Sequence, residues 1–529
     1  MRTFHSYGPV DCEEHFCVPR KELVESCTSQ IIGNPDKQGH YFTIWAPRQT
    51  GKTWLMRQVK KEVESCYSEK FLVGCLSVQG VIMEHNDLDE VFFRQLPRVI
   101  RDGGFQVEPE KPKTWDDWID WFSKSRGLFD KPLILFIDEF DSLPLGIIDR
   151  LVTIFRDMYL KHENYMIHGL ALIGVRAVLG VESTSGSPFN IQKSLHVPNL
   201  TKIEVENLFS QYQKQSGQKI APGVIDKLYE STRGQPGLIS WFGELITEKF
   251  NPGIEKNIDI DTWNYVYSRA CRTEWNNTLL NMTAKVKKRY TQHVLELFIN
   301  PEIEFSLRAD WCSYLYLNGV IDAQDMMDSN NMPFQVCCFS SPFIQQNIYQ
   351  ALTNDLAGDS LPILALDPLD DLSDVLEKLE LDLPALLSRY KDYLKRLKAK
   401  GLNPWKEQPR RSDLNLREAA GHFHIYAWLQ NAVGRRCTVS PEFPTGNGRV
   451  DIWIKCHDKQ GIIEVKSFKD LSELNRSKIQ AARYAKKLGL NAVTLAVFIP
   501  VQDEDVIEKL SSVSEIEGVK VAAVVIGWG

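Results

Sequence analysis

The segment Ala46–Thr53 (APRQTGKT) has the residue types and spacing of a phosphate-binding loop. The apolar run HYFTIWA before it predicts a strand, and KTWLMRQVKK after it has helical spacing. In that setting loop N–H groups and the helix N-terminus point at a β-phosphate, Lys52 reaches the β- and γ-phosphate oxygens, and the Thr53 hydroxyl binds Mg²⁺. The sequence therefore predicts an ATP site, with contacts from Pro47, Arg48, Gln49, Thr50, Gly51, Lys52 and Thr53.

A second run, PLILFIDEFD (132–141), predicts a buried strand that ends in two acids. Asp138 would complete the Mg²⁺ shell, and Glu139 would act as a catalytic residue that orients and activates the attacking water. An acid pair that only caps a helix is the structural alternative. Arg176, at the end of GLALIGVRAV, is a candidate sensor of the γ-phosphate, and a surface salt bridge is its alternative.

Further along the chain, three residues have the types that phosphodiester hydrolysis needs. RVDIWI and GIIEVKSF, within 448–468, are joined by the turn CHDKQG and predict a hairpin. Asp451 and Glu464 would lie on its adjacent strands, and Lys466 shares a face with Glu464 because side chains alternate along a strand. The two carboxylates are candidate ligands of Mg²⁺, with Mn²⁺ as an alternative ion. Lys466 would position a water or stabilise charge on the phosphate.

Two predicted helices flank this hairpin. NLREAAGHFHIYAWLQNAV carries Glu418 near its start, a candidate third metal ligand. SKIQAARYAKKLG carries Gln480 and Tyr484 four residues apart, hence on one helix face, and Gln480 is a candidate catalytic residue. We expect packing or surface roles for His422 and His424, which follow Glu418.

The elements that must position these residues alternate along the chain. Five apolar runs between about residues 41 and 200 are separated by helical stretches, which predicts a parallel α/β sheet covered on both faces. Three amphipathic helices follow up to about residue 250. From about 258 to 353, two helices, one short strand and a final helix favour a winged-helix-like module, with a packing or coupling module as the alternative. Residues from about 415 predict a compact α/β unit.

The first of these regions resembles the AAA-like ATPases of prokaryotes, which are related to signal-transduction ATPases with numerous domains. The resemblance rests on GPVDCEEHFCVPR (8–20), APRQTGKT, LFIDEFD, SPFNIQKSLHVPNL and TRGQPGLI, and Ala46 in place of the usual first glycine is common there. It implies ATP binding with slow or stimulated hydrolysis, and self-assembly into a homo-oligomer. It also implies that GQPG (234–237) is a lid motif in which Pro236 approaches the nucleotide.

The second site resembles the restriction-endonuclease-like superfamily, the PD-(D/E)XK nucleases. The matching pattern is D–x12–E–x–K at Asp451, Glu464 and Lys466, with Q–x3–Y at Gln480, and it spans about residues 415–500. The resemblance implies a central mixed sheet flanked by helices and metal-dependent cleavage of nucleic acid, usually DNA. Here GRV stands before the aspartate instead of proline. Some members keep the fold and lose the chemistry, which leaves catalytic activity a separate question.

Together these patterns predict a multidomain α/β protein in five segments. They are a P-loop ATPase core (1–200), a helical lid (201–255), a winged-helix-like helical domain (256–354), a linker with a basic helix (355–400) and a PD-(D/E)XK nuclease-like domain (401–529).

The basic helix is the predicted nucleic-acid contact. Ten Lys or Arg outnumber four Asp or Glu between Arg389 and Glu418, so this segment would neutralise phosphates, and Trp405 within it would stack on a base. A solvated amphipathic helix is the alternative. Because the whole chain has a net charge of −7, any nucleic-acid surface must be a local patch.

The remaining composition bears on the compartment. The 11 cysteines show no paired CxxC spacing, the first residues lack the basic-then-apolar pattern of a signal peptide, and no apolar run reaches ~18 residues. Free thiols in a reducing cytoplasm, without membrane association, are the expectation.

The combined hypothesis is an ATP-regulated nuclease. By analogy with related ATPase–nuclease fusions, it would act in prokaryotic defence against phage or other foreign DNA. The rival is an ATP-dependent signalling or DNA-binding switch whose nuclease-like domain is inactive, and a third reading is an ATP-driven motor on DNA.

Overall fold

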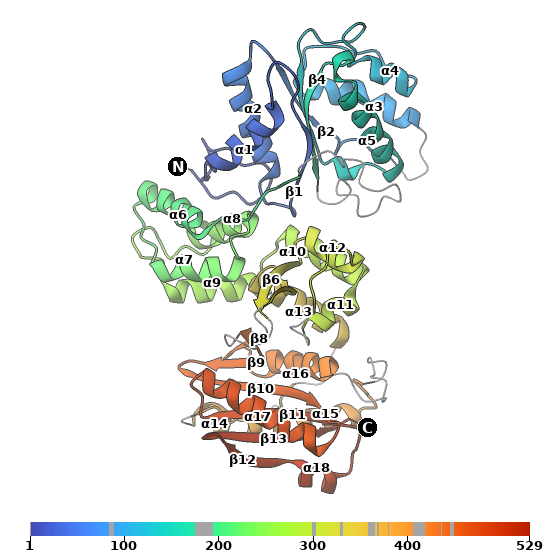
Figure 1. Ribbon diagram of the computed structural model, residues 1–529. Coiled ribbons are helices and arrows are strands. Elements are labelled where there is room, and N and C mark those ends of the chain that lie inside the picture. Colours follow the sequence, from blue (N-terminus) through green and yellow to red (C-terminus); the bar gives the residue numbers. More distant parts are fainter. Residues whose placement is uncertain are drawn as a thin grey trace. The chain divides into compact units, whose positions relative to one another are not determined.

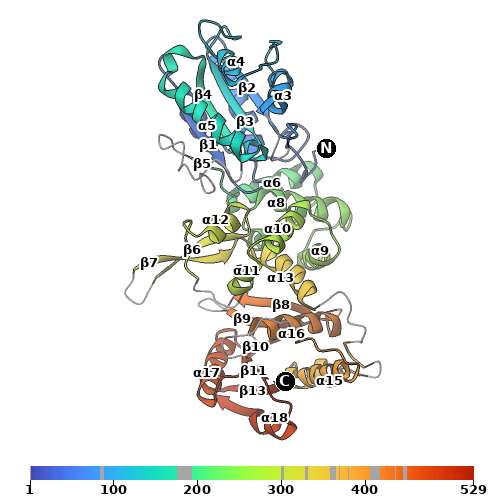
Figure 2. The ribbon, with the colours of Figure 1, turned by 90° about the vertical axis from the view of Figure 1, so that its right-hand side faces the viewer.

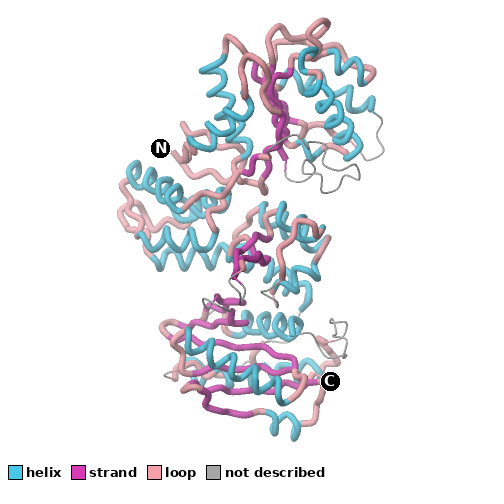
Figure 3. The backbone as a smooth tube through the Cα atoms, in the orientation of Figure 1, coloured by secondary structure: helices cyan, strands magenta, loops and turns pink. Residues whose placement is uncertain are grey.

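The protein was examined as a computed structural model. It describes residues 2–83, 89–174, 194–298, 303–327, 332–357, 365–367, 370–378, 380–405, 418–434, 436–444 and 449–528 (Figures 1 and 3). The chain forms two compact units, Met1–Met282 with Glu304–Ile344, and Thr283–Ile303 with Gln345–Gly529. The chain passes between the units three times, inside α10 (Asn277–Lys288), between Ile303 and Glu304, and inside α13 (Pro342–Ala357).

The first unit contains a five-stranded parallel sheet in the order β2-β3-β4-β1-β5. Its strands are β1 (Tyr41–Trp45), β2 (Leu72–Ser77), β3 (Leu133–Asp138), β4 (Ile167–Gly174) and β5 (Leu195–His196). All five apolar runs of the sequence are therefore confirmed as strands. β1, β3 and β4 are buried on both faces, which explains their near-continuous apolar character.

Helices cover both faces of this sheet (Figure 1). One face packs against α1 (Lys21–Ile32) and α2 (Lys52–Tyr67), and the other against α3 (Asp89–Asp102), α4 (Trp115–Asp120) and α5 (Leu145–Leu160). Single turns of 3₁₀ helix lie at Phe140–Ser142 and His162–Asn164. The carboxyl ends of β1 and β3 consequently meet at one edge, where ligands of open parallel sheets bind.

The three amphipathic helices expected after the sheet are present. They are α6 (Lys202–Ser216), α7 (Pro222–Thr232) and α8 (Pro236–Glu244), which continues as a π-helical turn over Leu245–Lys249. Thr201 begins α6 with a capping box, and α7 and α8 each have proline in the first turn, where its missing N–H costs nothing. Then come α9 (Ile260–Arg272), α10, α11 (Thr291–Leu297) and α12 (Asp310–Leu317).

A two-stranded hairpin follows α12 where the sequence predicted a single short strand. β6 (Ile321–Met327) and β7 (Pro333–Phe339) pair in antiparallel fashion, and α13 comes next. That prediction was wrong because most of β6, IDAQDMM, is exposed and so lacks the apolar alternation that marks a strand. The described part of the hairpin carries Asp322 and Asp325 and no basic residue, which favours a packing or coupling role over DNA reading.

The second unit contains a six-stranded mixed sheet in the order β12-β13-β11-β10-β9-β8. The strands are β8 (Thr438–Pro444), β9 (Arg449–Cys456), β10 (Lys459–Ser467), β11 (Ala492–Ile499), β12 (Ser512–Ile516) and β13 (Val519–Gly527). β10, β11 and β13 are parallel, whereas β8, β9 and β10 form an antiparallel meander. The predicted hairpin of RVDIWI and GIIEVKSF is thus confirmed as β9 and β10.

Helices lie on both faces of this second sheet (Figure 2). α17 (Leu471–Lys487) covers one face, and α15 (Leu383–Ala399) and α16 (Glu418–Ala432) cover the other. The unit also contains α11 and two short helices, α14 (Ser373–Leu376) and α18 (Glu504–Leu510). No helix within the described ranges combines the length and apolar composition needed to cross a bilayer.

Two cysteine pairs are disulfide-bonded, Cys12–Cys17 and Cys437–Cys456. The expectation of free thiols throughout is therefore wrong at these four positions. Cys437 directly precedes β8, and Cys456 is the last residue of β9. Because Thr438 pairs with Lys455, the two cysteines lie opposite each other. Strand register, which the sequence does not display, brings them together.

Candidate functional site

The loop Ala46–Gly51 joins the end of β1 to the start of α2, the context that a phosphate loop requires. Gln49 (φ 58°) and Gly51 (φ 94°) have left-handed backbones that turn the chain tightly. Lys52 Nζ donates hydrogen bonds to the carbonyl oxygens of Ala46 (2.9 Å) and Pro47 (2.7 Å). Burial lowers the pKa of Lys52 to about 8, against the opposing effect of nearby carboxylates.

The acids at the end of β3 meet the start of α2. Thr53 Oγ1 donates to Asp138 Oδ2 at 2.7 Å, so the hydroxyl and the carboxylate predicted to bind Mg²⁺ lie together. Burial, with Asp138 and Asp141 nearby, raises the pKa of Glu139, whose backbone is left-handed (φ 56°). A carboxylate with a raised pKa is a better proton acceptor. A hydroxyl and one carboxylate also suit Mg²⁺, which retains waters and binds phosphates.

The start of α8 lies directly on the phosphate loop. Gly237 N donates to the carbonyl of Gln49 (3.0 Å), and Gln235 Nε2 donates to the carbonyl of Arg48 (3.2 Å). Gln235 also caps α8 by accepting from Leu238 N. Pro236 stands between these two contacts, at the first turn of the helix. The role of Gln235 was missed from the sequence, although it is the second residue of GQPG.

The segment between α12 and β6 also contacts the phosphate loop. Gly319 (φ 75°), between α12 and β6, lies so close to Pro47 that a Cβ there would meet the proline Cβ at 2.9 Å. The rings of Trp45 and Tyr316 are 5.7 Å apart. No local sequence pattern predicts this contact. Arg176, the predicted γ-phosphate sensor, lies outside the described residues.

In the second unit, the three predicted nuclease residues converge. Lys466 Nζ lies 3.6 Å from Asp451 Oδ2 and 3.8 Å from Glu464 Oε2, and Asp451 Oδ2 also accepts a hydrogen bond of 2.6 Å from Val465 N. The side chains of Asp451 and Lys466 are 25% and 22% exposed, whereas Glu464 is buried. The cluster is therefore open to solvent on one side.

This donor set suits a small divalent cation. Mg²⁺ binds proteins through one or two carboxylates and keeps several waters, and the cluster provides two carboxylates. Within the described ranges, no group of three or more His, Cys, Asp or Glu could hold a metal. Glu418, the predicted third ligand, is the first residue of α16, and its side chain lies outside the described residues.

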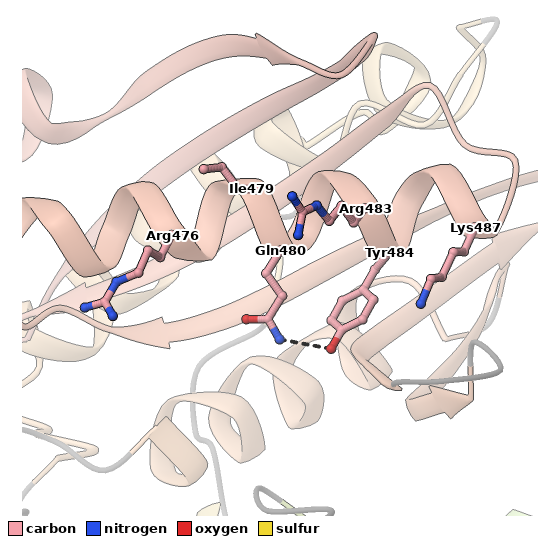
Figure 4. A pocket seen from close by; sticks show the side chains of 6 residues that line it. All are labelled: Arg476, Ile479, Gln480, Arg483, Tyr484 and Lys487. Atoms are coloured by element: carbon pink, nitrogen blue, oxygen red, sulfur yellow. Dashed lines mark hydrogen bonds between the residues drawn. The ribbon is translucent and has the colours of Figure 1, made fainter. Parts of the chain in front are cut away.

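Gln480 is on α17 and not on the hairpin that carries this cluster. Its Nε2 donates to the hydroxyl of Tyr484 at 2.9 Å, one turn along the same helix (Figure 4). Arg476, Gln480, Tyr484 and Lys487 extend to the same side of α17 in Figure 4. With Ile479 and Arg483 they line a hollow of about 470 Å³. This hollow carries three positive charges.

The basic segment around α15 differs from its prediction. Trp405 is only 5% exposed and packs against His424 and Phe498 at ring distances of 4.7 and 5.5 Å, so the prediction that it stacks on a base is wrong. The sequence misled because a tryptophan among charges can also be an anchor in the core. Residues 406–417 lie outside the described ranges.

The charges of α15 are largely engaged within the unit. Arg389 bonds Asp374 at 2.7 Å, Lys395 bonds Glu504 at 2.8 Å, and Lys398 bonds Gln502. These contacts favour the solvated-helix alternative for α15. The expectation of packing roles for His422 and His424 is confirmed, since both are buried. Burial lowers the pKa of His424 to about 4, so its ring is neutral in the core.

A family model described as an AAA-like domain matches residues 5–251. Among solved structures, a Walker-type ATPase of Pyrococcus abyssi is similar at 13% identity and TM-score 0.43, over 65% of this chain and 99% of that one. The ORC1 protein of Aeropyrum pernix in complex with DNA is similar at 13% identity and TM-score 0.32, over 64% and 93%.

The RuvB Holliday junction branch migration motor of Thermotoga maritima is similar at 12% identity and TM-score 0.33, over 60% of this chain and 92% of that one. The chain has no significant match among curated proteins. The family match coincides with the sheet, the phosphate loop and the three helices that follow. Residues 5–251 therefore form an AAA-like P-loop ATPase domain.

Proposed function

We propose that the protein is a nuclease regulated by ATP, in which the first unit binds the nucleotide and the second cleaves DNA with the help of Mg²⁺ or Mn²⁺. The observation that carries the proposal is the convergence of Lys466 with Asp451 and Glu464, all within 4 Å of the lysine nitrogen. Two carboxylates beside a lysine, on adjacent strands and open to solvent, form a set suited to hydrolysing a phosphodiester.

Each residue of the cluster has a distinct role in this proposal. Asp451 and Glu464 hold the cation, which when bound would polarise the phosphate and lower the pKa of a water. Lys466, which lies within 4 Å of both carboxylates, orients the attacking water or stabilises the charge that develops on the phosphate. The hydrogen bond from Val465 N fixes one oxygen of Asp451 and so limits its rotation.

The hollow on α17 is the proposed contact for the nucleic-acid backbone. Ile462 packs beneath α17, and since side chains alternate along β10, Glu464 and Lys466 belong to the same face of the sheet. Arg476 and Lys487, which form no ion pair among the described residues, can neutralise phosphates, while Gln480 and Tyr484 can donate hydrogen bonds to them. The backbone would then run along α17 toward the acids.

In the first unit, ATP binding would replace hydrogen bonds that the free protein makes within the site. Lys52 would leave the carbonyl oxygens of Ala46 and Pro47 for the β- and γ-phosphates, and the pair Thr53–Asp138 would open to hold Mg²⁺. Glu139 would accept the proton of the attacking water. Because Gln235 and Gly237 bond the loop backbone, a change in the loop reaches α8 directly.

The nuclease proposal is tested with purified full-length protein on supercoiled plasmid, linear duplex, single-stranded DNA and RNA, with Mg²⁺ or Mn²⁺. We expect DNA cleavage, and Lys466→Ala to reduce the rate by at least about a hundredfold, as the loss of one charge-stabilising group does. Lys469→Ala removes an exposed lysine three residues away, paired with Glu473, and should cleave like wild type. Cleavage retained in Lys466→Ala would point to a contaminating nuclease.

The regulatory half is tested by running the same reaction with ATP, a non-hydrolysable analogue, ADP or no nucleotide. We expect the cleavage rate to depend on the nucleotide in the wild type and to lose that dependence in Lys52→Ala. If the protein binds ATP but cleaves nothing under any metal, the rival is correct and the chain is an ATP-dependent switch. Strong stimulation of ATP turnover by DNA would instead indicate a motor.

A defence role would follow from a nuclease activity of this kind. It predicts that phage form fewer plaques on cells expressing the wild-type chain than on cells expressing Lys466→Ala. Equal plating of a broad phage panel on both would contradict it.

A further inference from the structure

A buried histidine holds the backbone of Asp451. His422 Nε2 lies 2.8 Å from the carbonyl oxygen of Asp451, and His422 Nδ1 lies 2.6 Å from the hydroxyl of Tyr349. A carbonyl oxygen can only accept, so Nε2 carries the hydrogen of the first bond. Nδ1 is then the acceptor for the tyrosine O–H, and the two bonds together fix both the tautomer and the plane of the ring.

The position of Asp451 in the sheet explains why such a donor is needed. Among the described strands, the pairing of β9 includes Ile452 and Val450 but passes over Asp451 between them. A half-buried carbonyl without a donor is costly, and His422 supplies one at this interruption of the ladder.

Tyr349 is itself anchored by aromatic packing. It is fully buried on α13, stacks on Phe423 with ring centroids 4.5 Å apart, and meets Tyr426 and Phe298 edge-on at 4.5 and 5.0 Å. Its hydroxyl therefore has little freedom to leave His422. The chain of contacts runs from α13 through α16 to β9.

We infer that His422 is a positioning residue for Asp451, and that Tyr349 on α13 holds His422 in its working orientation. Asp451 is then fixed at two points, by His422 at its carbonyl and by Val465 N at its carboxylate. This fixes the carboxylate beside Lys466. The inference rests on the proposed function for its metal and catalytic consequences, but not for the geometry of Asp451.

The location of Tyr349 gives the arrangement a second consequence. The division between the two units falls inside α13, between Ile344 and Gln345, so Tyr349 lies about one helical turn beyond it. A shift or rotation of α13 that separates the Tyr349 hydroxyl from His422 would release Asp451. The helix is thus a covalent route by which the ATPase-bearing unit can reach the proposed nuclease site.

The test uses the full chain and a matched control. Tyr349→Phe removes only the hydroxyl, His422→Leu removes the donor, and His422→Gln keeps an N–H near the place of Nε2. Tyr390→Phe is the control, because the buried Tyr390 hydroxyl makes the same 2.6 Å bond to His424 Nδ1, a histidine without a bond to Asp451. Mn²⁺ affinity, kcat and KM for cleavage, thermal stability, and hydrogen exchange of the Val465 amide in metal-free protein are measured for each.

We expect Tyr349→Phe and His422→Leu to weaken Mn²⁺ binding about 10- to 100-fold and to lower kcat more than they change KM. His422→Gln should recover most of both losses. Tyr390→Phe should lower the unfolding temperature as much as Tyr349→Phe and leave Mn²⁺ affinity and kcat unchanged. The inference is overturned if Tyr349→Phe and His422→Leu bind Mn²⁺ like wild type, or if Tyr390→Phe shows the same losses.

Hydrogen exchange separates this inference from the proposed function. If wild-type protein binds no Mn²⁺ and cleaves nothing, the proposed function fails. The positioning role is then supported if His422→Leu speeds exchange of the Val465 amide at least tenfold while Tyr390→Phe does not. It is overturned if the amide exchanges equally in all variants.

Discussion

Lys52 donates both of its hydrogen bonds to carbonyl groups of its own loop, and burial lowers its pKa to about 8. A bound phosphate would attract the ammonium form and raise that pKa, so nucleotide binding takes up a proton at pH values above about 8. We expect ADP affinity to be constant below this pH and to fall above it, by up to about tenfold per pH unit.

Titration of a fluorescent ADP between about pH 7 and 9.5 measures this dependence. The Lys52→Arg variant is the control, because a guanidinium stays charged over the whole range and should give a flat profile. A flat profile for the wild type would mean that Lys52 remains charged in the free protein.

Trp405 lies in a basic segment but belongs to the core of the second unit. Deleting a buried aromatic side chain costs about 3–5 kcal/mol, so Trp405→Ala should lower the free energy of unfolding of this unit by that amount. Trp275, which is 76% exposed, is the control, and its substitution by alanine should stay within about 0.5 kcal/mol. Denaturant unfolding measures both; weaker nucleic-acid binding at unchanged stability would restore the base-stacking interpretation.

The residues with chemistry were predictable from sequence where one segment or one hairpin carries them. Lys52 and Thr53 are the first residues of α2, directly after the loop. Asp451, Glu464 and Lys466 share a hairpin whose alternation places them together. His422 and Tyr349 were not predictable as partners, because 73 residues separate them and only tertiary packing joins them to Asp451. The contact of Gly319 with Pro47 is of the same kind.

At the scale of elements, Gly237 allows α8 to pack closely against the phosphate loop. Gly237 is the second residue of α8, and a Cβ there would lie 2.5 Å from Gln49 Oε1 and 2.7 Å from Gln49 Cβ. Gly237→Ala should therefore displace the loop and weaken ADP binding about tenfold, or about 1.4 kcal/mol. Gly223 is the second residue of α7, also after a proline, and its Cβ would meet only the Ile260 side chain, at 3.2 Å from Cδ1 and 3.8 Å from Cγ1.

Gly223→Ala is thus the matched control and should bind ADP like wild type. Equal affinities for the two alanine variants would show that α8 can move away from the loop without cost. Isothermal titration with ADP, with circular dichroism to confirm folding, makes the comparison.

Helices and strands were predictable where burial imposes a pattern of apolar residues on the sequence, and they were missed where it does not. The central strands β1, β3 and β4 of the first sheet are buried on both faces and appear as apolar runs. Thr201 and the prolines of α7 and α8 mark helix starts. β6 is mostly exposed and was missed. Sheet order and register, which place Cys437 beside Cys456, depend on contacts that no local window contains.

At the scale of the whole molecule, a net charge of −7 repels nucleic acid, so binding must come from a local concentration of positive charge. Two helices of the second unit compete for that role. On α15, Lys395 and Lys398 are engaged with Glu504 and Gln502, whereas Arg476 and Lys487 on α17 line an open hollow on the face of the sheet that carries Lys466. The number of basic residues in the sequence favoured α15 as the nucleic-acid contact. The contacts that these residues make in the structure favour α17 instead.

This difference predicts how salt should affect DNA binding. Each phosphate neutralised contributes about 0.9 to the slope of the logarithm of affinity against the logarithm of salt concentration. Replacing Arg476 and Lys487 by alanine should therefore reduce the magnitude of the slope by about two on any duplex sequence. The matched double variant Lys395→Ala with Lys398→Ala should keep the wild-type slope. Fluorescence anisotropy between about 50 and 200 mM salt measures both, and a slope lost in the α15 variant instead would return the binding surface to that helix.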